Sequence, residues 1–230
     1  MRVAVLTVGD ELLAGDTENT NATWLCRRLT ERGVEVERVT TVPDRVADIA
    51  RVTNEYHAEY DAVLLTGGLG PTPDDRTMEG VASAFGRAVE PHEEARTWLT
   101  EHRGYANEDL AEGTTHLPAG ARMLPNEVGV APGAVVEGVY VLPGVPAEMR
   151  AMFEEVADEF EGTPRYVETV RTPEPESALL DRIREVGERF DVTVGSYPGE
   201  TVRLKVTAFD PETAAAAASW LRERVEPAGE

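Results

Sequence analysis

Over the first 80 residues, strand-type and helix-type patterns of apolar and polar positions alternate along the chain. "RVAVLTV" (residues 2–8) is a short β-branched run, which predicts a buried strand. "TNATWLCRRLTERG" (20–33) places Leu25 and Leu29 at helical spacing and ends in glycine, which predicts a helix. The two patterns then repeat, with strands expected at 34–40 and 61–68 and a helix at 45–60. Such alternation predicts parallel β-α-β units joined by right-handed crossovers.

The rest of the chain predicts further elements and a second, smaller domain. A helix is expected over 91–104, irregular chain over 105–125, a hairpin over 133–144 and a helix from Pro146. Prolines then frame a strand, followed by a helix (177–190), two strands (192–197 and 201–209) and an alanine-rich helix (211–225). We therefore expect an α/β first domain, residues 1–163, with a parallel or mostly parallel sheet and helices on both faces. Residues 164–230 are expected to form a small α+β domain.

The acidic composition limits the kinds of partner. The chain carries 43 acidic against 22 basic residues, a formal net charge of −21, and Lys205 is its sole lysine. Such a field repels polyanions, so no nucleic-acid partner and no membrane partner is expected. The apolar run at the amino terminus is broken by Asp10 and Glu11, too early for a secretory signal, and no stretch reaches membrane-spanning length. A cytoplasmic protein is predicted.

A glycine-rich loop, "TGGLGPTPDDRT" (66–77), follows the third expected strand. It is no Walker loop, which needs Gly-Lys-Ser/Thr, and no dinucleotide fingerprint, because Pro73 stands where a third glycine belongs. Its amides can point at an anion, as can the amino terminus of a helix beginning near Thr77. Asp74 and Asp75 should repel that anion. Either both cap the helix, or one holds a hydrated divalent cation that bridges to phosphate oxygens.

Two further strand ends also supply carboxylates. Asp10 and Glu11 in "GDELLAG" follow the first strand, and Asp44 in "TVPDR" follows the second. Because the carboxyl ends of parallel strands meet at one edge of a sheet, these acids should lie near the glycine loop. The alternative for "GDELLAG" is a turn leading into a helix.

Two polar motifs have both a structural and a binding interpretation. "ENTNATW" contains Asn19, Thr20 and Asn21, which either cap a helix or offer amide groups to a heterocycle or ribose. "VLPGVPAEM" repeats the order of strand, turn at Pro143-Gly144, and helix. Its Glu148 would be stabilised in the first helical turn by the helix dipole whether or not it binds a ligand.

Together, "VGDELLAGDTENTN", "TGGLGPTPDDRT" and "LPGVPAEM" resemble the amino-terminal region of the competence/damage-inducible protein A family. That resemblance implies a molybdopterin-binding domain of the MoaB/Mog type, and "ESALLDRIREVGERFDVTVGSYP" resembles the family's small KH-like domain. Domains of this superfamily bind molybdopterin, and some adenylylate it with ATP and magnesium. This branch is associated with metal-dependent hydrolysis of nucleotide pyrophosphates such as ADP-ribose. The KH-like segment lacks the basic G-x-x-G loop that clamps RNA.

The resemblance also assigns residues. It implies Asp75 and Asp44 as catalytic acids and Asp75 with Asp74 as ligands of a divalent cation, Mg²⁺ or another. The family's usual Asp-Thr-Asn is here Asn-Thr-Asn, with Asn19 in the acid's place. The expected ligand-binding residues are Gly67, Gly68, Gly70, Thr72, Asp10, Glu11, Asn19, Thr20, Asn21, Pro143, Gly144 and Glu148.

These features lead to one functional expectation and one alternative. The expectation is a homo-oligomeric hydrolase that cleaves a nucleotide pyrophosphate with a divalent cation. The alternative is a protein that binds molybdopterin or adenylylates it in molybdenum cofactor synthesis. In both cases the partner is a small nucleotide or pterin.

The charge of −21 predicts that salt stabilises the fold, because screening acts within about 10 Å at 0.1 M salt and relieves self-repulsion. We expect the melting temperature to rise steadily from low to multimolar potassium chloride. A melting temperature that stays flat or falls across that series would contradict the prediction.

Overall fold

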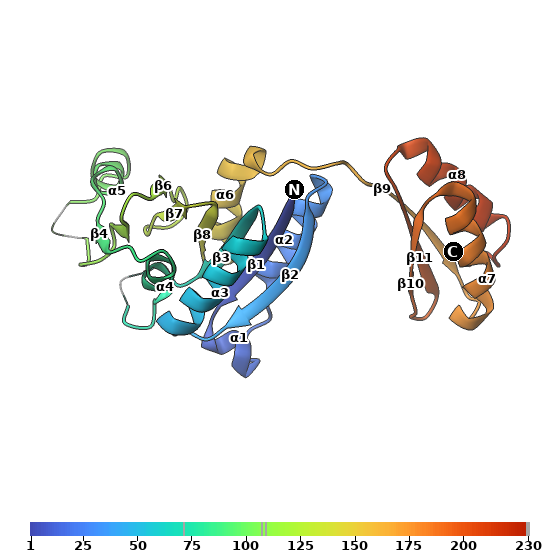
Figure 1. Ribbon diagram of the computed structural model, residues 1–230, viewed down its shortest axis with the longest axis horizontal. Coiled ribbons are helices and arrows are strands. Elements are labelled where there is room, and N and C mark those ends of the chain that lie inside the picture. The colour runs from blue at the N-terminus through green and yellow to red at the C-terminus, as the bar shows by residue number, and fades with distance from the viewer. Residues whose placement is uncertain (71, 107, 109, 229–230) are drawn as a thin grey trace. The chain divides into compact units, whose positions relative to one another are not determined.

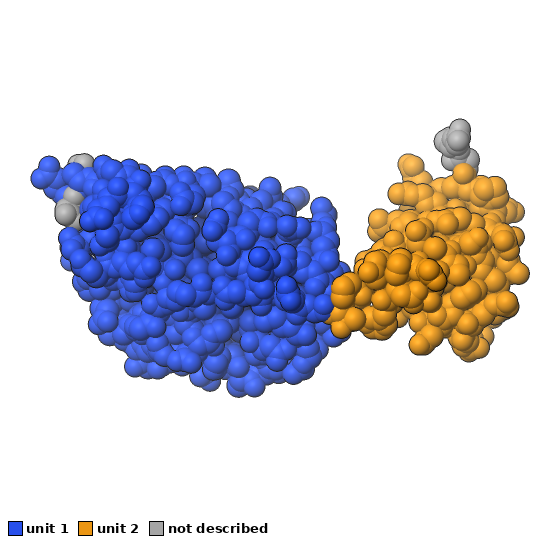
Figure 2. Space-filling model, turned by 90° about the horizontal axis from the view of Figure 1, so that it is seen from above, with its two compact units in different colours: residues 1–162 blue, residues 163–230 orange. Residues whose placement is uncertain are grey.

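The computed structural model describes residues 1–70, 72–106, 108 and 110–228. The chain divides into two compact units, residues 1–162 and residues 163–230, which Figure 2 shows in blue and orange. The expected boundary between 163 and 164 lies one residue further along the chain. Each unit has its own buried apolar core, so each is described separately.

A six-stranded sheet forms the centre of the first unit (Figure 1). Its order is β2 (Glu35–Val42), β1 (Arg2–Val8), β3 (Ala62–Gly67), β8 (Val139–Pro143), β7 (Gly133–Val136) and β6 (Arg122–Leu124). The first four strands are parallel, and β7 and β6 continue antiparallel. The expected mostly parallel sheet is confirmed.

Helices cover both faces of this sheet, as the alternation of side chains along buried strands requires. In β1, Val3 and Val5 join one core cluster and Ala4 and Leu6 join the other. The first cluster includes buried side chains of α2 and α6, and the second includes those of α3 and α4. These helices are α2 (Thr20–Glu31), α6 (Pro146–Val156), α3 (Val46–Glu59) and α4 (Thr77–Ala84).

The chain between α4 and β7 differs from its prediction. The helix expected over 91–104 is a short α5 (Glu93–Thr97) that continues as a π-helical turn (Trp98–His102). The chain expected to be irregular contains β6 and also β5 (His116–Pro118), which pairs with β4 (Val89–Pro91). The expected helix is therefore present within its range, with its second half π-helical. The expectation of irregular chain was wrong, because strands of three residues are too short to display a period.

Two short helices also occur among the described residues of the first unit. They are α1 (Asp10–Ala14), directly after β1, and a 3₁₀ turn at Ala157–Glu159 after α6. The first agrees with the expected turn and helix start in "GDELLAG". No helix in the described chain is long and apolar enough to cross a membrane.

The second unit is a three-stranded antiparallel sheet with two helices against one face (Figure 1). The strand order is β10 (Thr193–Tyr197), β11 (Val202–Ala208) and β9 (Tyr166–Thr172). The helices are α7 (Glu176–Phe190) and α8 (Pro211–Arg222). Its core contains Leu204 and Val206 of β11 packed with Leu179, Val186 and Leu221 of the helices. This is the small α+β module that the sequence predicts.

The contact between α3 and α4 generates a stability prediction. A methyl group on Gly80 of α4 would overlap the buried side chain of Ile49 in α3. Alanine normally favours a helix over glycine by about 1 kcal/mol. At this site the cost of overpacking should exceed the gain in helix preference. We therefore expect Gly80→Ala to lower the free energy of unfolding by about 1–3 kcal/mol, as measured by chemical denaturation. Ser83→Ala, an exposed change in the same helix, should be neutral or stabilising. A stabilising Gly80→Ala would contradict this packing.

Candidate functional site

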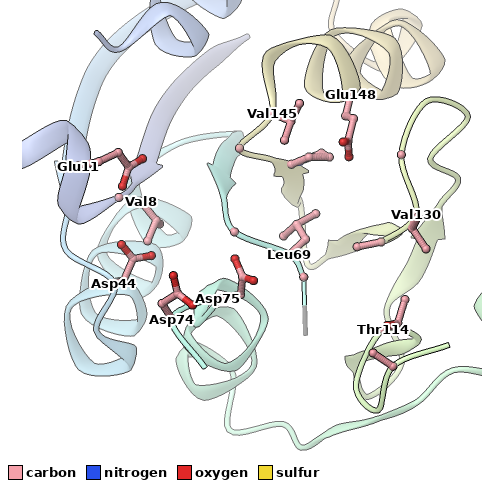
Figure 3. A pocket seen from close by; sticks show the side chains of 18 of the residues that line it. Val8, Glu11, Asp44, Leu69, Asp74, Asp75, Thr114, Val130, Val145 and Glu148 are labelled. Atoms are coloured by element: carbon pink, nitrogen blue, oxygen red, sulfur yellow. The ribbon is translucent and has the colours of Figure 1, made fainter. Parts of the chain in front are cut away.

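The four parallel strands end at one edge of the central sheet, and a predicted motif follows each of them. In β3 and β8 the last residues, Gly67 and Pro143, are direct register partners, which places the glycine loop beside the Pro-Gly turn. The loops after β1 and β2 are joined where the backbone N–H of Asp10 donates to Asp44 Oδ2 at 2.8 Å. These four loops border a cavity of about 720 Å³ (Figure 3).

Five carboxylates line this cavity, from Glu11, Asp44, Asp74, Asp75 and Glu148 (Figure 3). No lysine, arginine or histidine lies among the described residues of its wall. A phosphate group entering alone would therefore meet like charge on several sides. A ligand that carries phosphate needs either a cation or backbone donors to offset this repulsion.

The donor set suits a cation that is held jointly by protein and ligand. Within the described residues, no three His, Cys, Asp or Glu side chains lie close enough to hold a metal ion by themselves. Mg²⁺ usually takes only one or two protein carboxylates and completes its shell with water and substrate phosphate. Asp74 and Asp75, neighbours in the sequence at the cavity wall, supply two such carboxylates.

Asp75 is bound by its own loop. The backbone N–H of Thr72 donates to Asp75 Oδ2 at 3.3 Å, and the Thr72 hydroxyl donates to the same oxygen. A methyl group on Gly68 would overlap Asp75 Oδ1, so glycine is required for this close approach. The carboxylate thus takes donors that a phosphate would otherwise use. The neighbouring Asp74 is exposed at the cavity wall.

Burial and nearby negative charge alter the proton affinity of Asp44. Partial burial raises its pKa above the usual 3.8, and the negative charges of Asp10, Glu11 and Asp74 raise it further. The hydrogen bond from the Asp10 backbone acts in the opposite direction but does not cancel these effects. A carboxylate with a raised pKa is suited to accept or release a proton near a reacting group.

Glu148 is held by a residue that the sequence did not identify. Asn126, only 1% exposed, donates from Nδ2 to Glu148 Oε2 at 2.7 Å and to the Ala131 carbonyl at 2.9 Å. Its Oδ1 accepts from the Gly129 backbone at 2.7 Å. Arg103 donates to the carbonyl oxygens of the same loop. Asn126 therefore shapes one cavity wall, and its only sequence signal is the turn-forming "NEVG".

The wall away from the Asp44–Asp74 side is mainly apolar, although Glu148 also lies there (Figure 3). Figure 3 shows Asp44 and Asp74 on one side of the cavity and Val130 on the other. Leu69, Tyr105, Leu110 and Val145 also contribute apolar surface. A cavity with one strongly acidic side and one mainly apolar side suits a ligand that has a phosphate at one end and a flat ring at the other.

Asn19, Thr20 and Asn21 line an adjoining, smaller cavity of about 90 Å³, which shares Glu11 and Gly144 with the large one. Asn19 caps α2, because its Oδ1 accepts from the Ala22 backbone at 3.1 Å. Asn21 Nδ2 donates to the Gly144 carbonyl at 2.7 Å and so connects α2 to the Pro-Gly turn. The capping interpretation accounts for Asn19, and Asn21 has a positioning contact.

The predicted residues therefore fall into two groups. Nine line the large cavity, namely Glu11, Asp44, Gly68, Gly70, Asp74, Asp75, Pro143, Gly144 and Glu148. Gly67, Asp10, Thr72, Asn19, Thr20 and Asn21 do not line it. Gly67 is buried at the end of β3, and Thr72 lines an adjoining cavity of about 220 Å³.

Comparison with known proteins is consistent with this architecture. Residues 4–162 match the family described as "Probable molybdopterin binding domain". A protein from Archaeoglobus fulgidus is 39% identical over 199 residues, which cover 86% of each chain. A CinA-like protein from Geobacter sp. is 44% identical over 162 residues, or 67% of this chain and 39% of that protein.

A solved structure agrees in both sequence and fold. The crystal structure of CinA, of unknown function, from Thermoplasma acidophilum is 36% identical with a TM-score of 0.64. It covers 69% of this chain and 97% of its own. The first unit is thus a molybdopterin-binding-type domain of the α/β class. The chain belongs to the competence/damage-inducible protein A (CinA) family, with a MoaB/Mog-like domain, and the predicted resemblance is confirmed.

The raised pKa of Asp44 generates a pH prediction. The protonated carboxyl favours the folded state, because the pKa of Asp44 is higher there than its usual 3.8 in the unfolded chain. This contribution to stability is lost as pH rises from 3.8, and the loss is complete above the raised pKa of the folded state. We expect Asp44→Asn, which keeps the acceptor for the Asp10 N–H, to melt higher than the wild type at neutral pH. The difference should vanish below pH 3.8. Asp16→Asn, an exposed change, controls for removing one negative charge and should stabilise less. A lower melting temperature of Asp44→Asn at neutral pH would exclude this effect.

Proposed function

We propose that the large cavity binds a nucleotide pyrophosphate of the ADP-ribose type together with a divalent cation and hydrolyses it. The observation that carries this proposal is the set of five carboxylates without a basic side chain among the described residues of the wall. A diphosphate carries more charge than a single phosphate and depends more strongly on a cation in such a site. The apolar wall near Val130 would receive the flat base.

Asp74 and Asp75 would hold the cation. A divalent cation bound there supplies positive charge that offsets the diphosphate and the charge that develops in the transition state. Thr72 then positions the Asp75 carboxylate through the two hydrogen bonds it donates. The backbone amides of the glycine loop and the amino terminus of α4 would favour the phosphate oxygens.

Asp44 would act as the general base. In the proposed reaction a water oxygen attacks one phosphorus, its proton passes to Asp44, and the bond from that phosphorus to the bridging oxygen breaks. The bridging oxygen leaves with the second phosphate, so ADP-ribose yields AMP and ribose 5-phosphate. Burial and the charges of Asp10, Glu11 and Asp74 raise the pKa of Asp44, which strengthens it as a base.

A second candidate is favoured by the family itself. The match to a molybdopterin binding domain over residues 4–162 supports a pterin ligand, either simply bound or adenylylated with ATP. The two-sided cavity also suits a phosphorylated pterin, whose ring would take the apolar side. The two candidates differ in whether a pyrophosphate is cleaved when no pterin is present.

The metal requirement can be tested with a panel of ADP-ribose, FAD, NADH, and molybdopterin with ATP. We expect ADP-ribose or a related pyrophosphate to yield AMP only when a divalent cation is present, as followed by chromatography. Turnover that survives exhaustive chelation would exclude the cation. Inactivity on every pyrophosphate, with tight pterin binding, would establish the second candidate instead.

The role of Asp75 can be separated from that of a helix cap. Asparagine preserves the shape and the acceptor for Thr72, so Asp75→Asn should cost about 1 kcal/mol of stability or less. If Asp75 holds the cation, turnover should fall roughly 100-fold, or about 2.7 kcal/mol at the transition state. Asp74→Asn tests the more exposed acid and should have the smaller effect. Normal melting with most of the turnover retained in Asp75→Asn would show that its carboxylate is not catalytic.

A further inference from the structure

The second unit has one sheet face that its helices do not cover. Side chains of β11 alternate, with Leu204 and Val206 buried against α7 and α8 and with Arg203 and Lys205 on the opposite face. The register of β9 and β10 extends this open face over all three strands. Its members are Val167, Thr169 and Arg171 of β9, Arg203, Lys205 and Thr207 of β11, and Thr193, Gly195 and Tyr197 of β10.

The open face is basic in a strongly acidic chain. It contains three cations and no acid, although the chain has 43 acidic residues. Arg203 lies directly opposite Arg171 on one side and Tyr197 on the other. Lys205, the sole lysine of the chain, is the next residue along β11 on this face.

These three cations lack ion-pair partners among the described residues. No described carboxylate lies within ion-pair distance of Arg171, Arg203 or Lys205, whereas Arg182 and Arg222 of the same unit pair with Glu174 and Glu168. Like charges directly opposite on neighbouring strands destabilise a sheet. A bound anion would remove that cost.

Exposed aromatic rings accompany the charges. Tyr197 is 45% exposed, and the Arg203 guanidinium lies 5.0 Å from its ring centroid. A methyl group on Gly195 would lie 2.9 Å from the Tyr197 ring, so the ring rests close over the strand. Phe209, directly after β11, is 65% exposed. Rings held against a cationic sheet are platforms on which unpaired bases stack.

We propose that this open sheet face binds single-stranded RNA. Arg171, Arg203 and Lys205 would contact phosphates, Tyr197 would stack a base, and the Thr169 hydroxyl is placed on the same face to meet a 2′-OH. The net charge of the whole chain argues against any nucleic-acid partner, as the sequence predicts. That field is screened beyond about 10 Å at 0.1 M salt, so local charge decides at contact. The proposal does not depend on the function of the large cavity.

Fluorescence anisotropy of a labelled 12-nucleotide oligouridylate with the full chain tests this proposal. The key variant is Arg203→Glu with Lys205→Glu, and its control is Arg184→Glu with Arg189→Glu on exposed positions of α7. We expect the sheet variant to weaken binding at least about tenfold and to lower the salt slope by about one for each cation. The α7 variant should stay near the wild type.

A pair of single variants tests stacking while preserving charge. Tyr197→Leu should weaken binding about fivefold or more, whereas Tyr197→Phe should keep most of it. Melting curves of all variants confirm that each is folded. DNA of the same sequence should bind more weakly than RNA, and an RNA duplex should bind poorly.

Four results would overturn the proposal. They are absence of binding by the wild type at 0.05 M salt, equal losses in the sheet and α7 variants, equal affinity for duplex and single strand, and displacement of RNA by an equal charge of polyglutamate. The last result would identify an acidic polypeptide as the partner of this face.

Discussion

Parallel pairing of β1 with β2 and β3, and of β3 with β8, is the constraint on which the candidate site depends. Because these strands run in the same direction, their following loops emerge at one edge of the sheet. Two hydrogen bonds then connect segments at this edge that are distant in sequence, from the Asp10 N–H to Asp44 and from Asn21 in α2 to the Gly144 carbonyl. The cavity is therefore a consequence of strand direction, and residues as distant in sequence as Val8 and Glu148 meet in it.

Crowding of carboxylates at that edge determines what the cavity can accept. Asp75 already occupies the donors of Thr72, so a bare phosphate would have to displace a carboxylate while facing four more. A cation shared between ligand and protein turns the repulsion between carboxylates and phosphate into attraction of both groups to the cation. The same acids raise the pKa of Asp44, which connects the electrostatics of binding to the proton transfer proposed for catalysis.

Long, regular patterns could be predicted from the sequence, and contacts between short irregular segments could not. The strand at 2–8 and the hairpin over 133–144 were predicted, and the positive φ angles of Glu137 (48°) and Gly138 (80°) form its tight turn. The bond between Asn126 and Glu148 could not be predicted, because it joins a loop to a helix 22 residues away. The basic sheet face could not be predicted from the sequence for another reason. The alternation of Arg203 and Lys205 was visible, but only the fold shows that helices cover one face alone.

Ligand and cation should bind to the large cavity together, and thermodynamic linkage makes this coupling reciprocal. Binding of Mn²⁺, followed by electron paramagnetic resonance, should be measured with and without an ADP-ribose analogue whose bridging oxygen is replaced by methylene. The analogue should tighten Mn²⁺ binding to the protein at least about tenfold, after correction for Mn²⁺ bound to free analogue, and Mn²⁺ should tighten analogue binding to the protein by the same factor. Analogue binding that is equally tight after chelation of all metal would contradict this coupling.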